Sequence, residues 1–209
     1  MILLPKLRLG ITVSSGPEFM ETIGRMGVKN ASITSSLLNA DNAGAYMEYA
    51  RKANITIEAV HTDGSGNCAE LAAAVGAQAL CVASPDTGII GTVSDGAKKA
   101  GLKYLIWEPS GIGIEDCRRT LAEINNSSAV PVKLALSLES PDVIERCIAV
   151  GKNAMIVIRM EDSLPMLGKA IDSLRTGGSK ENLVLIDMPN ADIDGVKACV
   201  ENCRSFIRE

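Results

Sequence analysis

Aromatic side chains are scarce in this chain, which has one Trp, three Tyr and two Phe among 209 residues. A hydrophobic core must therefore be built from Ala, Val, Ile, Leu and Met, and the 46% hydrophobic content is enough for a full core. A single His excludes a His-rich zinc cluster. The six Cys include no Cys-x-x-Cys pair, which is typical of a protein from a reducing cytoplasm.

Basic runs and long apolar runs are also missing. The net charge is −4, and no cluster of Lys and Arg provides the electrostatic footprint of nucleic-acid binding. The apolar start MILLPKLRLG is too short and too soon charged for a signal peptide or a membrane span. We therefore expect no nucleic-acid or membrane partner and predict a small-molecule ligand, while self-association into a homo-oligomer stays open.

What the chain does contain is a repeat of a short apolar strand followed by a helical pattern. The predicted strands cover residues 7–13, 28–34, 55–61, 79–83, 102–108, 132–138, 154–159 and 183–187. The predicted helices cover residues 17–26, 40–53, 67–76, 92–100, 114–125, 141–150, 163–175 and 191–207. Glycines 27, 76, 101 and 151 stand just before the next strand, where a helix end favours positive φ.

Eight such units predict a compact (β/α)8 TIM barrel formed by residues 1–209 as a single domain. The alternative is a doubly wound open sheet, which normally has fewer strands and one glycine-rich loop. Gly64 and Gly66 follow the third strand without a third glycine in register, so a dinucleotide fingerprint is absent. We therefore expect no nucleotide cofactor.

The loops after the strands of such a barrel form its working end. Strand alternation predicts that a ring of ionisable side chains gathers at this mouth: His61, Glu108, Glu139, Arg159, Glu161 and Asp187. In the sixth strand Leu134, Leu136 and Leu138 should pack beneath the helices, and Lys133 and Ser137 should face the axis. Lys103 and Lys133 stand at strand beginnings, which disfavours a Schiff-base aldolase because its lysine is needed at the mouth.

The third strand contains a conflict. If His61 points inward, then Ala59 and Ile57 point inward behind it. The same alternation places Glu58 among the helices, where a carboxylate is costly to bury. A β-bulge or a side chain that reaches back to water is required there.

Several segments resemble the xylose-isomerase-like sugar isomerase/epimerase barrels. LKYLIWEPS at 102–110 resembles the fifth strand of that family, and VPVKLALSLES at 130–140 resembles the sixth, often written VPVxLCLDxGH. ITIEAVHTD at 55–63 is similar to a third strand that often carries a His, and ELAAAVGAQALCV at 70–82 is similar to ELAxxLGAxxLVV.

The resemblance implies a barrel in which Glu108 is a metal ligand and an acid/base. The other family ligands change: the sixth-strand Asp falls on Ser137, the seventh-strand His on Arg159 and the eighth-strand Glu on Asp187. The metal site implied is therefore Glu108 with Asp187, and oxygen ligands favour a weakly bound Mg²⁺ or Mn²⁺.

These observations predict an isomerase or epimerase of a small sugar or sugar phosphate, which moves a proton next to a carbonyl. Glu108, Glu139 and His61 are the catalytic candidates. Arg159, Glu161 and Trp107 are the candidates for substrate binding, with Arg159 on an anionic group. The alternative is a metal-free barrel that binds a small anion without turnover. Metal-dependent phosphodiester cleavage is a third hypothesis, which one His and an acidic balance disfavour.

Overall fold

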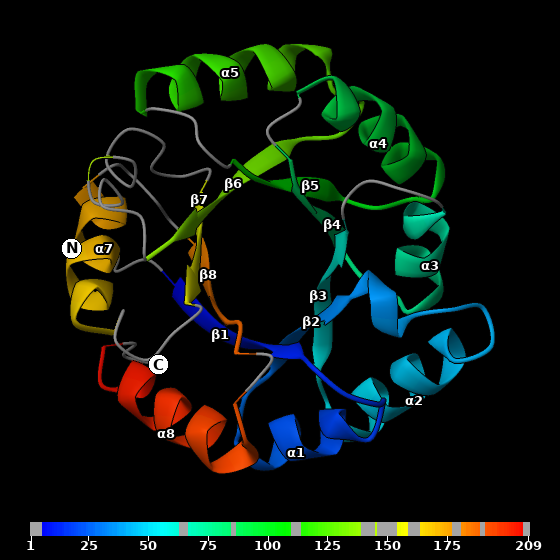
Figure 1. Ribbon diagram of the computed structural model, residues 1–209, viewed down its shortest axis with the longest axis vertical. Helices are drawn as coiled ribbons and strands as arrows, with labels where there is room; N and C mark the ends of the chain where they lie inside the picture. The colour runs from blue at the N-terminus through cyan, green and yellow to red at the C-terminus, as the bar shows by residue number, and fades with distance from the viewer. Residues whose placement is uncertain are drawn as a thin grey trace.

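Eight parallel strands form a closed barrel in the computed structural model (Figure 1). The structure describes residues 6–62, 67–84, 87–109, 114–138, 145, 154–158, 164–176, 181–188 and 191–206. The strands are β1 (Lys6–Val13), β2 (Asn30–Thr34), β3 (Thr56–Thr62), β4 (Ala79–Ala83), β5 (Tyr104–Glu108), β6 (Val132–Ser137), β7 (Ala154–Ile158) and β8 (Glu181–Ile186). Each pairs with the next in the chain, and β8 pairs with β1. The predicted TIM-barrel fold is confirmed.

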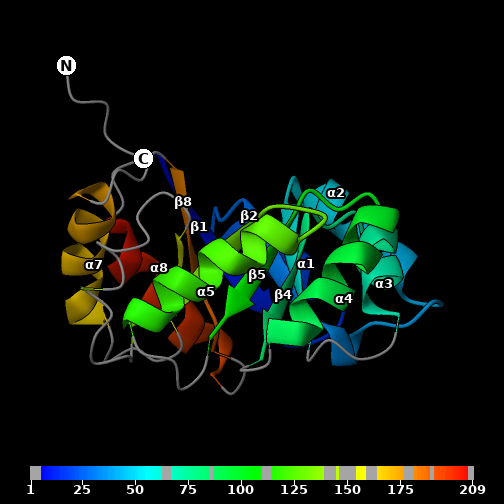
Figure 2. The same ribbon diagram turned by 90° about the horizontal axis from the view of Figure 1, so that it is seen from above.

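The helices form a ring outside the strands (Figures 1 and 2). They are α1 (Phe19–Arg25), α2 (Ala43–Ala53), α3 (Cys68–Ala74), α4 (Thr87–Lys99), α5 (Ile114–Ser127), α7 (Leu164–Thr176) and α8 (Ile193–Arg204), with a 3-10 turn η1 (Ser35–Leu37). α4 begins at Thr87, five residues before the predicted start at 92. The prediction missed these first turns because Gly88 and Gly91 weaken the helical pattern of the sequence there. The helix predicted over 141–150 lies outside the described residues, apart from Glu145.

Glycines end three of the helices as expected. Gly27, Gly76 and Gly101 have φ of 73°, 72° and 78°, in the left-handed region that a side chain disfavours. Gly151 lies outside the described residues. Each of these glycines ends its helix at the amino end of the barrel, where the next strand begins.

The core has two layers, one on each side of the strands. The outer layer lies between strands and helices and includes Leu105, Trp107, Leu134 and Leu136. The inner layer fills the barrel and consists of Ala59, Ala79, Cys81, Ile106, Ala135, Leu183 and Leu185, with Tyr104 packed against it. The alternation predicted for β6 is thus confirmed, and β5 and β8 alternate in the same way, while the side chains of β7 lie outside the described residues.

Gly10 in β1 makes room for that inner layer. A Cβ atom at Gly10 would stand 3.2 Å from Leu185 Cδ1 and 3.3 Å from Leu183 Cδ1. These distances are shorter than ordinary van der Waals contact, so a side chain at this position would displace both leucines. The missing side chain lets the leucines of β8 reach the barrel axis.

β3 contains a β-bulge, one of the two alternatives that its sequence left open. In the pairing with β2, Ala31 stands opposite Ile57 and Ser32 stands opposite Ala59, so Glu58 is the extra residue. Ile57 belongs to the outer layer and Ala59 to the inner layer. The prediction that Ile57 points inward is therefore wrong, because the bulge reverses the alternation before Ala59.

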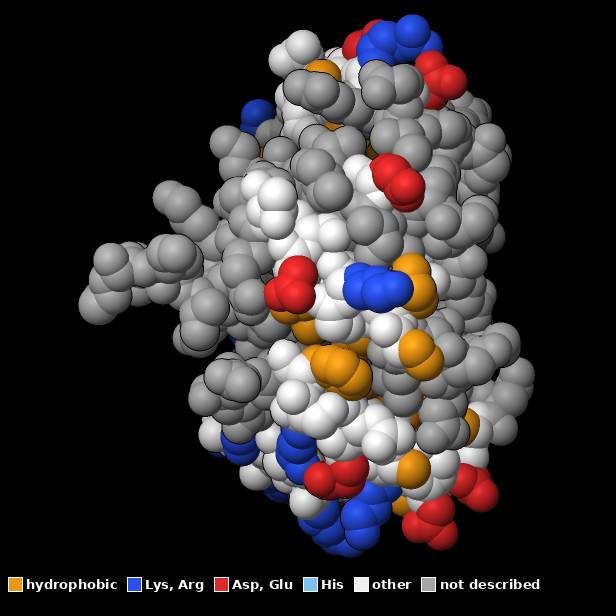
Figure 3. All heavy atoms as spheres, turned by 90° about the vertical axis from the view of Figure 1, so that its left-hand side faces the viewer, with side chains coloured by type: hydrophobic (Ala, Val, Ile, Leu, Met, Phe, Trp, Pro, Cys, Tyr) orange, Lys and Arg blue, Asp and Glu red, His pale blue; other side chains and the backbone are white. Residues whose placement is uncertain are grey.

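The surface offers only scattered large apolar side chains in the described part of the chain: Met47, Ile193 and Phe206. Figure 3 views the side where α7 lies, with small groups of hydrophobic side chains near the middle beside a few charged ones, and further charged side chains towards the ends. Scattered exposure of this kind is ordinary for a folded protein. Among the described helices, none combines the length and the apolar character needed to cross a bilayer.

Candidate functional site

His61 is held by hydroxyl groups of the two preceding strands. Its Nε2 atom lies 3.1 Å from Ser32 Oγ in β2, and Ser32 Oγ lies 2.9 Å from Thr12 Oγ1 in β1. Ser32 is 0% exposed, whereas His61 is partly exposed near the carboxyl end of β3. A buried hydroxyl that both donates and accepts can fix the direction of an imidazole ring. The chain of bonds therefore presents His61 at the barrel mouth in one orientation.

Ser32 and Thr12 were missed by the sequence analysis. Both are inward positions of strands, and an inward polar residue near a carboxyl end was the available signal. Hydroxyl side chains carry no charge, and their role depends on a partner from another strand, so the pattern of ionisable groups does not single them out.

Glu108 shares the mouth with His61, two strands away. In the ladder, His61 stands opposite Cys81 of β4, Cys81 opposite Ile106 of β5, and Ala83 opposite Glu108. Neighbouring strands are about 4.8 Å apart with a rise of about 3.3 Å per residue, so the two Cα atoms should be roughly 10–12 Å apart. Side chains that converge from this separation leave room for a small molecule between them.

Ala83 enlarges that room. It continues the inward series of Ala79 and Cys81 in β4, and it is exposed. Its methyl group is too small to fill the space between His61 and Glu108. A small, solvent-accessible inner residue flanked by an imidazole and a carboxylate is the arrangement expected of a ligand site.

The predicted site residues fall into three groups. His61, Glu108 and Asp187 stand at the carboxyl ends of β3, β5 and β8, each partly exposed. Glu139, Arg159 and Glu161 lie outside the described residues. The third group is Trp107 alone, which is 0% exposed in the outer layer and donates a hydrogen bond from Nε1 to the Ser84 carbonyl at 2.8 Å. Its burial beneath the helices corrects the prediction that it contacts substrate.

The described residues do not assemble a metal site by themselves. Among them, no group of three or more His, Cys, Asp or Glu side chains is close enough to hold an ion. β6 and β7 separate the strands that carry Glu108 and Asp187. A hard cation needs several oxygen ligands, so the predicted Mg²⁺ or Mn²⁺ depends on Glu139 or Glu161, outside the described residues.

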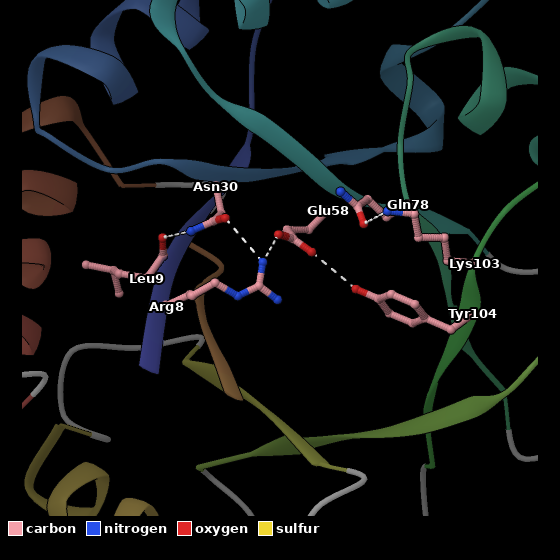
Figure 4. Close-up of polar contacts among 7 residues, drawn as sticks. All are labelled: Arg8, Leu9, Asn30, Glu58, Gln78, Lys103 and Tyr104. Atoms are coloured by element: carbon pink, nitrogen blue, oxygen red, sulfur yellow. Dashed lines mark hydrogen bonds and ion pairs between the residues drawn. The ribbon is translucent and has the colours of Figure 1, made fainter. Parts of the chain in front are cut away.

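A second polar cluster fills the amino end of the barrel interior (Figure 4). Arg8 of β1 forms an ion pair with Glu58, and the Tyr104 hydroxyl donates to Glu58 Oε2 at 3.1 Å. Lys133 Nζ stands 4.0 Å from the centre of the Tyr104 ring. Burial, followed by the charge of Glu58, raises the pKa of Tyr104 above its ordinary value. We call Arg8, Glu58 and Tyr104 the amino-end cluster.

The amino-end cluster holds the Glu58 side chain, which the sequence analysis placed among the helices. It is 1% exposed and lies inside the barrel, not among the helices. A buried carboxylate needs partners, and Arg8 and Tyr104 supply them. Lys133 lies in the same half of the barrel, far from the mouth, as its place at the start of β6 predicted.

Comparison with known proteins supports the fold and leaves the family open. No protein-family model matches the chain, and no curated protein matches it. A protein from Sinorhizobium meliloti 1021 has a similar structure, with a TM-score of 0.72 and 14% identity over 96% of this chain and 98% of that one.

Two enzymes are also structurally similar. A truncated 3-deoxy-D-arabino-heptulosonate 7-phosphate synthase from Thermotoga maritima has a TM-score of 0.65 and 13% identity, over 96% of this chain and 86% of that one. A 3-hexulose-6-phosphate synthase has a TM-score of 0.61 and 17% identity, over 97% of this chain and 99% of that one. At these identities the likeness defines the class, a (β/α)8 barrel. Membership of the xylose-isomerase-like family stays a prediction.

Proposed function

We propose that the carboxyl-end mouth binds a small sugar or sugar phosphate and moves a proton next to its carbonyl, as an isomerase or epimerase does. The observation that carries the proposal is the fixed His61 imidazole, bonded to the buried Ser32 hydroxyl, with Glu108 across the open position at Ala83. An imidazole and a carboxylate are the usual acid/base groups for such a transfer.

The reaction needs one base and one acid. The Glu108 carboxylate takes the proton from the carbon next to the carbonyl, and the C–H electron pair forms the carbon–carbon double bond. His61 donates a proton to the carbonyl oxygen, which gives a neutral enediol. Glu108 then returns the proton to the other carbon while His61 takes the hydroxyl proton from the first carbon, and this gives the isomer with both residues in their starting states. The epimer forms when water supplies a proton to the opposite face of the first carbon, His61 takes its proton back from the carbonyl oxygen and Glu108 releases its proton to water.

The solved relatives lend limited support. Two of them are named for sugar phosphates, so the same barrel architecture accommodates ligands of this class. A fold alone does not carry an activity, since TIM barrels host many chemistries. The alternative, a barrel that binds a small anion without turnover, shares the mouth and differs only in the absence of proton transfer.

Solvent exchange separates these two functions without knowledge of the product. The purified protein would be incubated in D₂O with a panel of short ketoses, aldoses and their phosphate esters, and ¹H NMR would follow the C–H next to the carbonyl. We expect exchange with at least one panel member, reduced on the order of 10²–10⁴-fold in Glu108→Gln. Glu123→Gln, an exposed position on α5, is the matched control and should keep the wild-type rate.

Two results would count against the proposal. Wild-type exchange in Glu108→Gln would remove Glu108 from the chemistry. Ligand-induced thermal stabilisation with no exchange for any panel member would favour the binding protein.

A further inference from the structure

The bulge in β3 decides which way His61 points. Alternation gives successive residues of a strand opposite directions. Glu58 and Ala59 break this rule, because both face the barrel interior, and Val60 then faces the outer layer. His61 consequently faces inward, where it reaches Ser32.

Without the bulge, Glu58 and His61 could not both be inside. In a regular β3 they are three positions apart and would lie on opposite faces. An inward Glu58 would then turn His61 towards the helices, and an inward His61 would bury the Glu58 carboxylate among apolar side chains. Because of the extra residue, Glu58 faces the interior at the amino end of the barrel and His61 faces the interior at the carboxyl end, both from the same strand.

The contacts that hold the bulge come from strands far along the chain. Arg8 reaches Glu58 from β1, and Tyr104 reaches it from β5 (Figure 4). Glu58 is the one residue of the bulge without a partner position in β2. Through this side chain, β1 and β5, each two strands away from β3, hold the extra residue inside the barrel.

We propose that the amino-end cluster is a positioning device for the mouth: Arg8 and Tyr104 hold Glu58 inside, this keeps the β3 bulge in place, and the bulge directs His61 onto Ser32. Its importance for turnover rests on the function proposed above, but the geometry does not. Arg8, Glu58 and Tyr104 are thus positioning residues that act through His61 without touching substrate.

The single His of the chain makes the test direct. Long-range ¹H–¹⁵N NMR of the imidazole reports its tautomer and the hydrogen bond at Nε2, with no substrate present. Ser32→Ala calibrates the signals of a ring that has lost this bond. We expect Arg8→Met and Glu58→Gln to move the His61 signals towards those of Ser32→Ala, and Tyr104→Phe, which keeps the ion pair, to move them less.

A matched control separates the cluster from general changes at the amino end. Lys103 lies at the same end and donates to Gln78 Oε1 at 2.9 Å, outside the cluster (Figure 4). Lys103→Met removes a cation as Arg8→Met does, and it should leave the His61 signals as in the wild type. If it moves them as much as Arg8→Met, the effect is not specific and the proposal fails.

A deletion tests the register itself. Removal of Glu58 leaves Ile57 followed by Ala59, which restores a regular strand with His61 still inward. Combined with Arg8→Met, which removes the cation that Glu58 neutralises, this deletion should return the His61 signals to those of the wild type. Signals like those of Ser32→Ala in the folded double variant would overturn the role of the bulge.

The outcome remains decisive if Arg8→Met or Glu58→Gln does not fold. Tyr104→Phe then supplies the comparison, and wild-type His61 signals in that variant overturn the proposal. The deuterium-exchange experiment tests the proposed activity and the imidazole spectra test the positioning device, so either proposal can be contradicted without the other. Shifted His61 signals without any exchange contradict the proposed activity alone, and exchange with unmoved His61 signals contradicts the positioning device alone.

Discussion

Polar side chains at the two ends of the barrel interior differ in their burial and in their partners. At the amino end, Glu58 is buried and satisfied by Arg8 and Tyr104. At the carboxyl end, His61 and Glu108 are partly exposed, and the bonds that orient His61 come from uncharged hydroxyls. Buried charges that are fully paired stabilise one arrangement, whereas partly exposed titratable groups remain available to a ligand. The contrast assigns stability and register to one end and chemistry to the other.

The largest loss of stability is expected when Arg8, the ion-pair partner of the buried Glu58, is replaced. Arg8→Met leaves the Glu58 carboxylate buried without its cation, and we expect a loss of about 3–5 kcal/mol in the free energy of unfolding. Glu108→Gln at the mouth should cost about 1 kcal/mol or less, because its amide can be hydrated. Urea denaturation of both variants measures the difference. Equal losses would mean that the two ends are not distinct in their contribution to stability.

Ser32→Ala probes the orienting bonds of the mouth. Thr12 and His61 lose their shared buried partner, so we expect a loss of about 1–3 kcal/mol, smaller than that of Arg8→Met. Ser205→Ala, an exposed position after α8, is the control and should change little. Thermal and urea unfolding give both values. A Ser32→Ala protein as stable as the wild type would show that the hydroxyl chain is not energetically coupled to the fold.

Tyr104→Phe should alter the alkaline limit of stability. The pKa of Tyr104 is raised in the folded protein by burial and by Glu58, so above the unfolded value of about 10 the unfolded chain loses this proton first. Stability from this group is therefore present below about pH 10 and falls as pH rises further. The variant should lose about 1 kcal/mol at neutral pH and show a shallower alkaline decline.

Unfolding midpoints of wild type and Tyr104→Phe between pH 8 and 12, in about half-unit steps, measure that difference. Tyr49→Phe on α2 makes the same chemical change outside the amino-end cluster and serves as the control. Parallel alkaline profiles for wild type and Tyr104→Phe would contradict the prediction.

The smallest effect is expected from metal. If Glu108 and Asp187 bind Mn²⁺ weakly with help from Glu139 or Glu161, stabilisation is on the order of 0.4 kcal/mol when the Mn²⁺ concentration equals Kd. Thermal melts with Mn²⁺ and with EDTA, on wild type and Glu108→Gln, measure it. A stoichiometric, tightly held ion would contradict weak binding, and a response retained in Glu108→Gln would place the ion elsewhere.

Much of the barrel could be predicted because each unit carries its own local pattern. The strand at 79–83 was located to the residue, and the alternation in β6 placed Leu134 and Leu136 beneath the helices. Glycines at 27, 76 and 101 marked helix ends through their positive φ. These features depend on neighbours in the chain, so a single sequence contains the information.

The number, order and direction of the strands therefore follow from local patterns in the chain, which also place His61, Glu108 and Asp187 at the carboxyl ends. The inward turn of Glu58, the outward turn of Ile57 and the bond between Ser32 and His61 arise only when the strands are assembled in the barrel. Strand alternation left a bulge and a side chain that reaches back to water as alternatives at Glu58, and the contacts that decide between them come from Arg8 and Tyr104, 50 and 46 residues away in the chain. Alternation is a property of one strand, whereas the partner of a buried charge is a property of the closed barrel.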